Sequence, residues 1–222
     1  MTRTRPAALA AALLALTAGG LTGTTGAAQA ATINYVALGD SYSAGGGSST
    51  TYLNSCNRST NAYPYLFAQA NSPATFSFQA CGAATTADVL NHQLAPLTSS
   101  TTLASMTIGG NDIGLREVLS SCLLGSDADC HGAVASAANT ARTELPGRLD
   151  TVYGSIRSRA VNAHVVILGY PRFYDLGSSF CPGISPTRRA ALNALNWPVG
   201  QSFHPTAAGQ SGAYLSALEA SD

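Results

Sequence analysis

The sequence predicts an α/β layered fold, in which parallel strands alternate with crossover helices. Short continuous apolar runs alternate along the chain with apolar residues at helical spacing, which is the pattern that such strands and helices produce. Three of the apolar runs end at a glycine, after which the chain turns. Together these observations indicate a parallel sheet covered by helices.

The composition is that of a globular protein with one domain. The chain has 222 residues, of which 45% are hydrophobic and 10% are charged, and this excludes charge-driven disorder. All 11 basic residues are arginine, and they form no run that could follow a phosphate backbone. Nucleic acid is therefore not expected as a partner.

Residues 1–30 have the pattern of a secretory signal peptide. Two arginines precede an apolar run over residues 7–16, and Ala28-Gln29-Ala30 is a small-x-small cleavage site. The run is interrupted well short of the roughly 20 residues that span a bilayer, so no transmembrane segment is expected. We therefore predict a secreted protein whose mature domain is residues 31–222.

Four segments are predicted strands. Three are continuous apolar runs, which is typical of strands buried on both faces. The fourth alternates apolar and polar residues, so it is expected at a sheet edge with one exposed face. The buried strands are residues 33–38, 104–108 and 164–168, and the edge strand is residues 75–80.

Two helices are predicted in the second half of the chain. The first has Pro146 in its opening turn and a buried stripe at positions i, i+3, i+4 and i+7. The second begins at an N-cap, Ser185, followed by Pro186, and extends to about residue 193. The stripe of the first helix consists of Leu149, Val152, Tyr153 and Ile156.

Residues 45–61 and 119–132 are rich in Gly, Ser, Asn and Cys, and both are predicted loops. All five cysteines lie after residue 30, and export allows disulfides to form. Two disulfides and one free cysteine can be arranged in about fifteen ways. Short sequence separation favours a Cys122–Cys130 bond, and Cys181 is the cysteine expected to stay unpaired.

Three polar motifs fall where functional groups gather in a parallel sheet. GDSYSAG (39–45) follows the first strand, GGND (109–112) follows the 104–108 strand, and SFHP (202–205) lies near the C-terminus. Each motif alone is ordinary, since the first two are common turns and a lone histidine is usually structural. Together they supply a nucleophile, an oxyanion donor and a general base, which predicts acyl transfer. The G-x-S-x-G elbow of α/β-hydrolases is excluded, because Ser43 stands where its last glycine would be.

Five segments, spread over nearly the whole mature chain, together resemble the GDSL or SGNH hydrolase family. They are GDSYSAG, GGNDIG, GQSFHPTAAGQSGAYL, ACGAATTADV around Cys81, and the strand AHVVILGYP. The resemblance is closest to its secreted actinobacterial esterases, lipases and phospholipases. It implies a flavodoxin-like three-layer α/β/α sandwich with a central parallel sheet, an ester or lipid substrate, and no metal or organic cofactor. A monomer is expected.

The resemblance assigns Ser41 as the nucleophile and His204 as the base. The oxyanion hole would consist of the Asn111 side chain and the backbone N–H groups of Ser41 and Ala83. Relatives have glycine at the position of Ala83, so this donor requires Ala83 to adopt the backbone conformation that glycine allows. Many relatives have Asp three residues before the histidine, but here that residue is Gln. The resemblance then implies a Ser-His dyad whose histidine is oriented by the main-chain carbonyl of Ser202.

The chain also departs from its relatives before Trp197. Relatives have further chain there, with another strand and a sixth cysteine, so the sheet is expected to lack its last edge strand. Cys181 thereby loses its partner. The resemblance pairs the other cysteines as Cys56 with Cys81 and Cys122 with Cys130.

We therefore predict a secreted serine ester hydrolase, an esterase or lipase. Two alternatives stay open: a carbohydrate or aryl esterase, because one fold carries several chemistries, and a catalytically impaired scaffold or deletion variant. Hydrolysis of a short chromogenic ester separates the enzymes from the scaffold. The preferred acyl-chain length separates the two kinds of enzyme.

Overall fold

The computed structural model describes residues 32–171, 185, 187–188 and 204–221. The predicted signal peptide, Ser202, Cys181 and the segment before Trp197 lie outside the described residues, and so does the predicted absence of a last edge strand. Within the described part of the chain, no helix is long and apolar enough to cross a membrane.

The described strands form one parallel sheet in the order β2-β1-β3-β4. This is the strand order of flavodoxin-like folds. The central strands β1 and β3 are almost wholly buried, whereas β2 lies at the edge with Thr75 exposed, as its alternating pattern predicts. All four predicted strands are present, with the bounds β1 Asn34–Gly39, β2 Thr75–Phe78, β3 Leu103–Thr107 and β4 His164–Ile167. The expectation that the last of them is buried is wrong for the described residues, because His164 and Ile167 are exposed in β4, which ends the described sheet.

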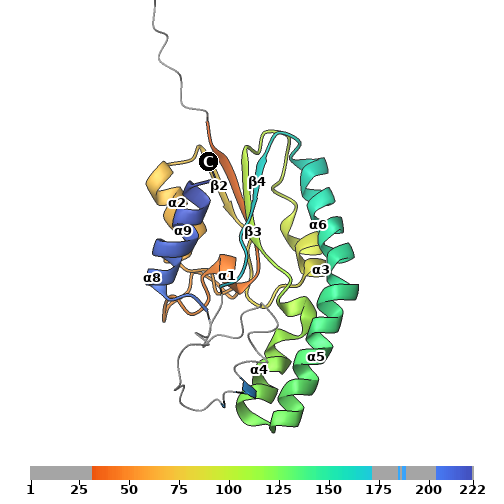
Figure 1. Ribbon diagram of the computed structural model, residues 1–222. Coiled ribbons are helices and arrows are strands. Elements are labelled where there is room, and N and C mark those ends of the chain that lie inside the picture. The colour runs from red at the N-terminus through yellow and green to blue at the C-terminus, as the bar shows by residue number, and fades with distance from the viewer. Residues whose placement is uncertain (1–31, 172–184, 186, 189–203, 222) are drawn as a thin grey trace, which may run out of the picture. The chain divides into compact units, whose positions relative to one another are not determined.

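Helices cover both faces of the sheet and give the predicted three layers (Figure 1). Alternate residues of β1 point to opposite faces. Tyr35 and Ala37 pack in one apolar cluster with α2 and α9, and Val36 and Leu38 pack in another with α6. The helices on the first face are α2 (Tyr63–Asn71), α8 (Ala207–Gly209) and α9 (Leu215–Glu219), and those on the second are α3 (Thr86–Asp88) and α6 (Leu145–Arg159).

The predicted helix α6 has the expected stripe. Val152 and Ile156 are fully buried, and Pro146 stands in the first turn, where its missing N–H is not needed. The predicted N-cap further along the chain is also present, because Ser185 Oγ accepts a hydrogen bond from the Arg188 N–H at 3.2 Å.

The prediction of a loop over residues 119–132 is wrong. This stretch contains the end of α4 (Leu115–Leu124) and the start of α5 (Asp127–Thr143). The Gly and Ser that suggested a loop are cap residues between the helices: Ser126 accepts from the Asp129 N–H and completes a capping box. The cysteines that suggested a loop, Cys122 and Cys130, are buried helix residues in an apolar cluster.

Both disulfides implied by the family resemblance are present. Cys56–Cys81 joins residues 45–61, which contain no helix or strand as predicted, to the chain after β2. Cys122–Cys130 joins α4 to α5. One disulfide therefore lies next to the carboxyl end of the sheet, and the other joins two peripheral helices.

Candidate active site

The first polar motif forms a sharp turn between β1 and a one-turn helix, α1 (Ser41–Ala44). Gly39 ends the strand with a φ of 118°, and a Cβ there would lie 2.4 Å from the carbonyl oxygen of Thr107 in the neighbouring strand. Only glycine fits this contact and this conformation. Asp40 follows as the N-cap, and its carboxylate accepts from the Tyr42 N–H at 2.9 Å. The turn places Ser41 directly beyond the carboxyl end of β1.

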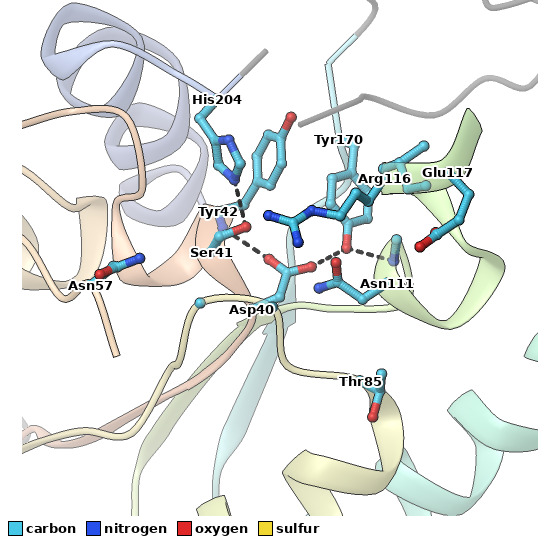
Figure 2. A pocket seen from close by; sticks show the side chains of 14 residues that line it. Asp40, Ser41, Tyr42, Asn57, Thr85, Asn111, Arg116, Glu117, Tyr170 and His204 are labelled. Carbon is cyan, nitrogen blue, oxygen red and sulfur yellow. Dashed lines mark hydrogen bonds between the residues drawn. The ribbon is translucent and has the colours of Figure 1, made fainter. Parts of the chain in front are cut away.

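His204 reaches Ser41 from the C-terminal segment, 163 residues away in the sequence. Its Nε2 lies 2.5 Å from Ser41 Oγ, so the serine and histidine of the two motifs are hydrogen-bonded (Figure 2). The imidazole ring stacks on Tyr42, with ring centroids 4.8 Å apart and planes 30° apart. A Cβ at Gly46 would lie 3.2 Å from His204 Cδ2 and 3.3 Å from Ser41 Cβ, so this glycine leaves room for both side chains.

Ala83 lies in the loop after β2 and has a φ of 63°. Ala83 therefore has the left-handed backbone conformation that is expected at this position, where relatives have glycine. Two backbone hydrogen bonds fix the residues before it, from the Cys81 N–H to Gly39 O at 3.0 Å and from the Gly82 N–H to Cys56 O at 2.8 Å. The Cys56–Cys81 disulfide joins the same two segments as the Gly82 to Cys56 hydrogen bond. The loop is therefore held against the end of β1.

Asn111 begins a 3-10 turn (Asn111–Ile113) after the end of β3. One of its two amide N–H groups donates to Ala84 O at 2.8 Å, and the other has no acceptor among the described residues. Asp112 joins the same two segments, because its carboxylate accepts from the N–H and the hydroxyl of Thr86 at 3.0 and 2.5 Å. The structure thus brings Asn111 beside the loop that contains Ala83.

Sequence reasoning missed Tyr170, which follows β4 at the same edge of the sheet. Its hydroxyl donates to the Asp40 carboxylate and accepts from the Gly110 N–H at 2.9 Å. Tyr170 therefore joins the GDSYSAG turn to the GGND turn (Figure 2). Burial raises the pKa of Asp40 to about 7, while hydrogen bonds from Tyr170 and from the Tyr42 N–H act to lower it. The available signal was position, since a polar residue follows the predicted strand 164–168.

Gln93 is a second site residue that the sequence did not reveal. It is buried in a π-helical turn (Val89–Gln93). Its side-chain oxygen accepts from the Gly39 N–H at 2.7 Å, and its NH₂ group donates to Gly39 O at 2.9 Å. Both polar groups of the glycine at the end of β1 are therefore held by one side chain.

The predicted residues line one pocket of about 370 Å³. Its wall also contains two charged residues from the first turn of α4, Arg116 and Glu117. Arg116 is exposed, extends into the pocket in Figure 2, and forms no ion pair with the described residues. No group of His, Cys, Asp and Glu in the described part of the chain could hold a metal ion. The predicted residues that line the pocket are Ser41, Ala83, Asn111 and His204.

Comparisons with known proteins agree with this geometry. The model of the GDSL-like lipase/acylhydrolase family matches residues 37–202. Lipase 1 of Streptomyces coelicolor is 44% identical over 254 positions, with 92% of this chain and 94% of the relative covered. A lipase of Streptomyces rimosus is 40% identical, with 98% of each chain covered. The alignment with Lipase 1 is longer than the 222 residues of this chain, so the relative has residues that this chain lacks.

Solved structures show the same similarity. The crystal structure of phospholipase A1 from Streptomyces albidoflavus NA297 matches with a TM-score of 0.82 and 40% identity over 86% of this chain and 100% of that one. An extracellular lipase from Streptomyces rimosus matches with a TM-score of 0.81 and 39% identity over the same shares. The chain therefore belongs to the GDSL-like lipase/acylhydrolase family and is a carboxylic ester hydrolase.

Proposed function

We propose that the protein is a secreted serine esterase or lipase that works through a Ser-His dyad. The observation that carries this proposal is the 2.5 Å contact between Ser41 Oγ and His204 Nε2. A serine hydroxyl is a weak nucleophile until a base accepts its proton. The imidazole is within the distance that such a transfer needs, and both residues line the pocket.

In the proposed reaction, Ser41 Oγ attacks the ester carbonyl while its proton passes to His204 Nε2. The negative charge that develops on the carbonyl oxygen is stabilised by N–H donors. The donors are the second amide N–H of Asn111 and the backbone N–H groups of Ser41 and Ala83. His204 then protonates the leaving alcohol, and a water molecule activated by the same imidazole releases the acid.

The orientation of His204 is proposed to come from two sides. The main-chain carbonyl of Ser202 would accept from Nδ1–H and fix the tautomer in which Nε2 is the base. The ring of Tyr42, stacked on the imidazole, limits its rotation. Asp40 is not proposed as the orienting acid, because the hydrogen-bond partners of its carboxylate are the Tyr42 N–H and the Tyr170 hydroxyl and not His204.

Secretion is proposed from two features. Residues 1–30 have the pattern of a signal peptide, which includes a small-x-small cleavage site. The fold contains two disulfides, and such bonds persist in oxidising compartments outside the cytosol.

A phospholipase is the second candidate function, and Arg116 favours it. The guanidinium is exposed and extends into the pocket (Figure 2). A guanidinium binds a phosphate group through paired hydrogen bonds. The matched structure from Streptomyces albidoflavus is described as a phospholipase A1. A phosphate in the alcohol part of the ester would therefore find a cationic partner beside Ser41.

A substrate panel tests these functions. The purified mature protein is given p-nitrophenyl esters of increasing acyl length, acetylated xylan and phosphatidylcholine vesicles, with Ser41→Ala as the inactive control. Hydrolysis of the nitrophenyl esters is expected, with a preference for acyl chains longer than acetyl. A preference for acetylated xylan would support the carbohydrate esterase, and no hydrolysis by a folded sample would support the inactive scaffold.

Arg116→Gln separates the phospholipase from a general esterase. The substitution keeps a polar side chain of similar reach and removes the charge. If the phosphate binds Arg116, kcat/KM for phosphatidylcholine is expected to fall about tenfold while kcat/KM for a neutral nitrophenyl ester stays within about twofold. An equal change for both substrates would argue against this role of Arg116.

A further inference from the structure

Gln210 is a fully buried polar residue that the proposed chemistry does not use. It follows His204 in the C-terminal segment and begins a π-helical turn (Gln210–Tyr214). Its side-chain oxygen accepts from the Tyr63 N–H at 3.0 Å, and its NH₂ group donates to Tyr42 O at 3.0 Å. A buried amide is costly unless its polar atoms are hydrogen-bonded, and these two contacts satisfy both ends of the side chain.

Both partners are backbone groups at the ends of helices. Tyr63 is the first residue of α2, whose N-cap, Ala62, makes no side-chain hydrogen bond. Helices normally need such a bond at their first N–H groups, and here a side chain distant in sequence provides it. Tyr42 belongs to α1, which has only four residues and includes Ser41. Gln210 therefore caps α2 and at the same time binds the helix that carries Ser41.

This contact connects the segment that carries His204 to the helix that carries Ser41. Tyr42 is held by the C-terminal segment at two points: its ring stacks on the imidazole, and its carbonyl accepts from Gln210. The same segment is fixed to the core by Tyr214, whose hydroxyl donates to Gly169 O at 2.9 Å. A shift of α1 relative to this segment would therefore change the distance between the serine and the histidine.

Gln93 makes a parallel arrangement on the other side of Ser41. Its amide binds the N–H and the carbonyl of Gly39, before the serine, whereas Gln210 binds the carbonyl of Tyr42, after it. Both glutamines are buried and both lie in π-helical turns, which are frequent at functional sites. The backbone around Ser41 is thus held from both sides by buried amide side chains.

We propose that Gln210 is a positioning residue, which keeps His204 Nε2 within hydrogen-bonding distance of Ser41 Oγ by fixing Tyr42. This inference rests on the proposed roles of the serine and the histidine. A displacement of about 1 Å between reacting groups can lower a rate about 100-fold. Loss of the Gln210 contact is therefore expected to lower kcat. KM should change little, because Gln210 is not among the residues that line the pocket.

The first test compares Gln210→Met with the parent on a short nitrophenyl ester. Methionine has a similar length and shape but makes neither hydrogen bond. We expect kcat to fall about 10- to 100-fold, while KM stays within about threefold. Thr101→Val is the matched control, because Thr101 is also buried and accepts a hydrogen bond, from the Thr98 N–H at 3.1 Å, in the turn before β3 at the opposite end of the sheet. It should lower Tm and leave kcat within about twofold.

Gln210→Glu provides a second readout, which a purely structural role would not change. A protonated glutamic acid can donate to Tyr42 O and accept from the Tyr63 N–H, as glutamine does. The ionised carboxylate carries no proton, so it cannot donate to Tyr42 O. Burial raises the pKa of such a carboxyl. The kcat of this variant relative to the parent is expected to be near one at low pH and to fall at higher pH. Circular dichroism at each pH establishes that the variant is folded.

Several results would overturn the inference. One is a folded Gln210→Met variant with the kcat of the parent, and another is an equal fall in Thr101→Val. If Gln210→Met does not fold, a Gln210→Glu to parent ratio that is independent of pH decides against the positioning role. An active parent with either result leaves the proposed function standing, whereas a parent without ester turnover overturns both.

Discussion

The pocket edge of the sheet and the corner between α4 and α5 each contain one disulfide, but different interactions hold the two regions. At the pocket edge, Cys56–Cys81 lies next to Ala83, which has a left-handed backbone conformation. The buried side chains of Gln93 and Gln210 bind backbone groups on either side of Ser41. At the corner, Cys122–Cys130 joins two helices that already pack through an apolar cluster and are separated by helix caps.

This difference indicates which substitutions should affect turnover and which should affect stability. The polar contacts at the pocket edge join segments far apart in sequence, such as Asp40 with Tyr170 and Gly39 with Gln93. Such contacts fix the relative positions of reacting groups. The contacts at the corner are the apolar cluster of α4 and α5, the caps between these helices and an ion pair of Asp127 with Arg188. None of them involves Ser41 or His204, so we expect them to contribute mainly free energy of folding.

The largest expected effect is on the pH dependence of stability, and it comes from Asp40. Burial raises its pKa to about 7, above about 3.9 in an unfolded chain. Between these values the folded protein holds a proton that the unfolded chain releases. This stabilisation is complete below about pH 4 and is lost as the pH rises through 7, an effect of about 4 kcal/mol at about 1.4 kcal/mol per pH unit. Urea unfolding from pH 4 to pH 8 measures it.

The matched acidic residue at the corner should act in the opposite direction. Hydrogen bonds from the Ser126 hydroxyl and then its backbone N–H hold the pKa of Asp129 below its usual value. The stabilisation by Asp129 is therefore present above about pH 4 and is lost as the pH falls through the lowered pKa.

The variant Asp40→Asn tests the assignment to Asp40. It should flatten the slope of the free energy of unfolding against pH between pH 4 and pH 7. An Asp40→Asn variant with the slope of the parent would contradict this assignment.

The next largest effect is on turnover. Asn111→Ala is expected to lower kcat about 100-fold or more, because loss of one oxyanion donor costs about 2.7 to 4 kcal/mol of transition-state stabilisation. KM should change far less. At the corner, Asp127→Asn breaks the 2.5 Å ion pair with Arg188 and should leave kcat within about twofold. Steady-state kinetics of both variants measure these effects. If the kcat of Asn111→Ala stays within about threefold of the parent value, Asn111 is a turn residue and not an oxyanion donor.

The two disulfides offer a direct comparison of the regions. On a chain-entropy model, Cys56–Cys81 stabilises by about 3.5 kcal/mol and Cys122–Cys130 by about 2.6 kcal/mol. Replacing either pair by alanine should therefore lower Tm. Only the Cys56/Cys81 variant should also lose turnover, by about tenfold, because it frees the loop that contains Ala83. Equal kcat values for the two variants, measured well below their melting temperatures, would show that the disulfide does not position this loop.

The smallest expected effect comes from backbone conformation. Ala83 has a φ of 63°, which costs about 1 to 2 kcal/mol for a residue other than glycine, and the greater entropy loss of glycine offsets about half of that. Ala83→Gly should thus raise the free energy of unfolding by about 0.5 to 1 kcal/mol without changing kcat. Gly132→Ala, in α5 with open space around it, should stabilise by a similar amount for the reverse reason. Destabilisation by Ala83→Gly would contradict this account.

The sequence predicted the residues whose signal is local. The strands appeared as apolar runs, and Ser41, Asn111 and His204 stood out because each lies in a short polar motif. Gln93 lies in no such motif, and Gln210 lies in GQSFHPTAAGQSGAYL without standing out from its polar and small neighbours. Their partners are backbone groups 54 or 168 residues away, which the sequence does not reveal.

The error over residues 119–132 has a related cause. Gly125 and Ser126 are typical of loops, but here they end one helix and cap the next. Composition alone does not distinguish a long loop from a tight connection between two helices. The buried faces of Leu119 and Cys122, which pack against α5, decide in favour of the helices, and that packing depends on tertiary structure.

The central claim is that Ser41 is the nucleophile and His204 activates it. Labelling with a fluorophosphonate, followed by peptide mass spectrometry, tests this most directly. The account predicts one adduct per chain, on the peptide that contains Ser41, formed at least about 100-fold more slowly in His204→Ala. An adduct on another residue, or no adduct in a folded sample that hydrolyses esters, would contradict it.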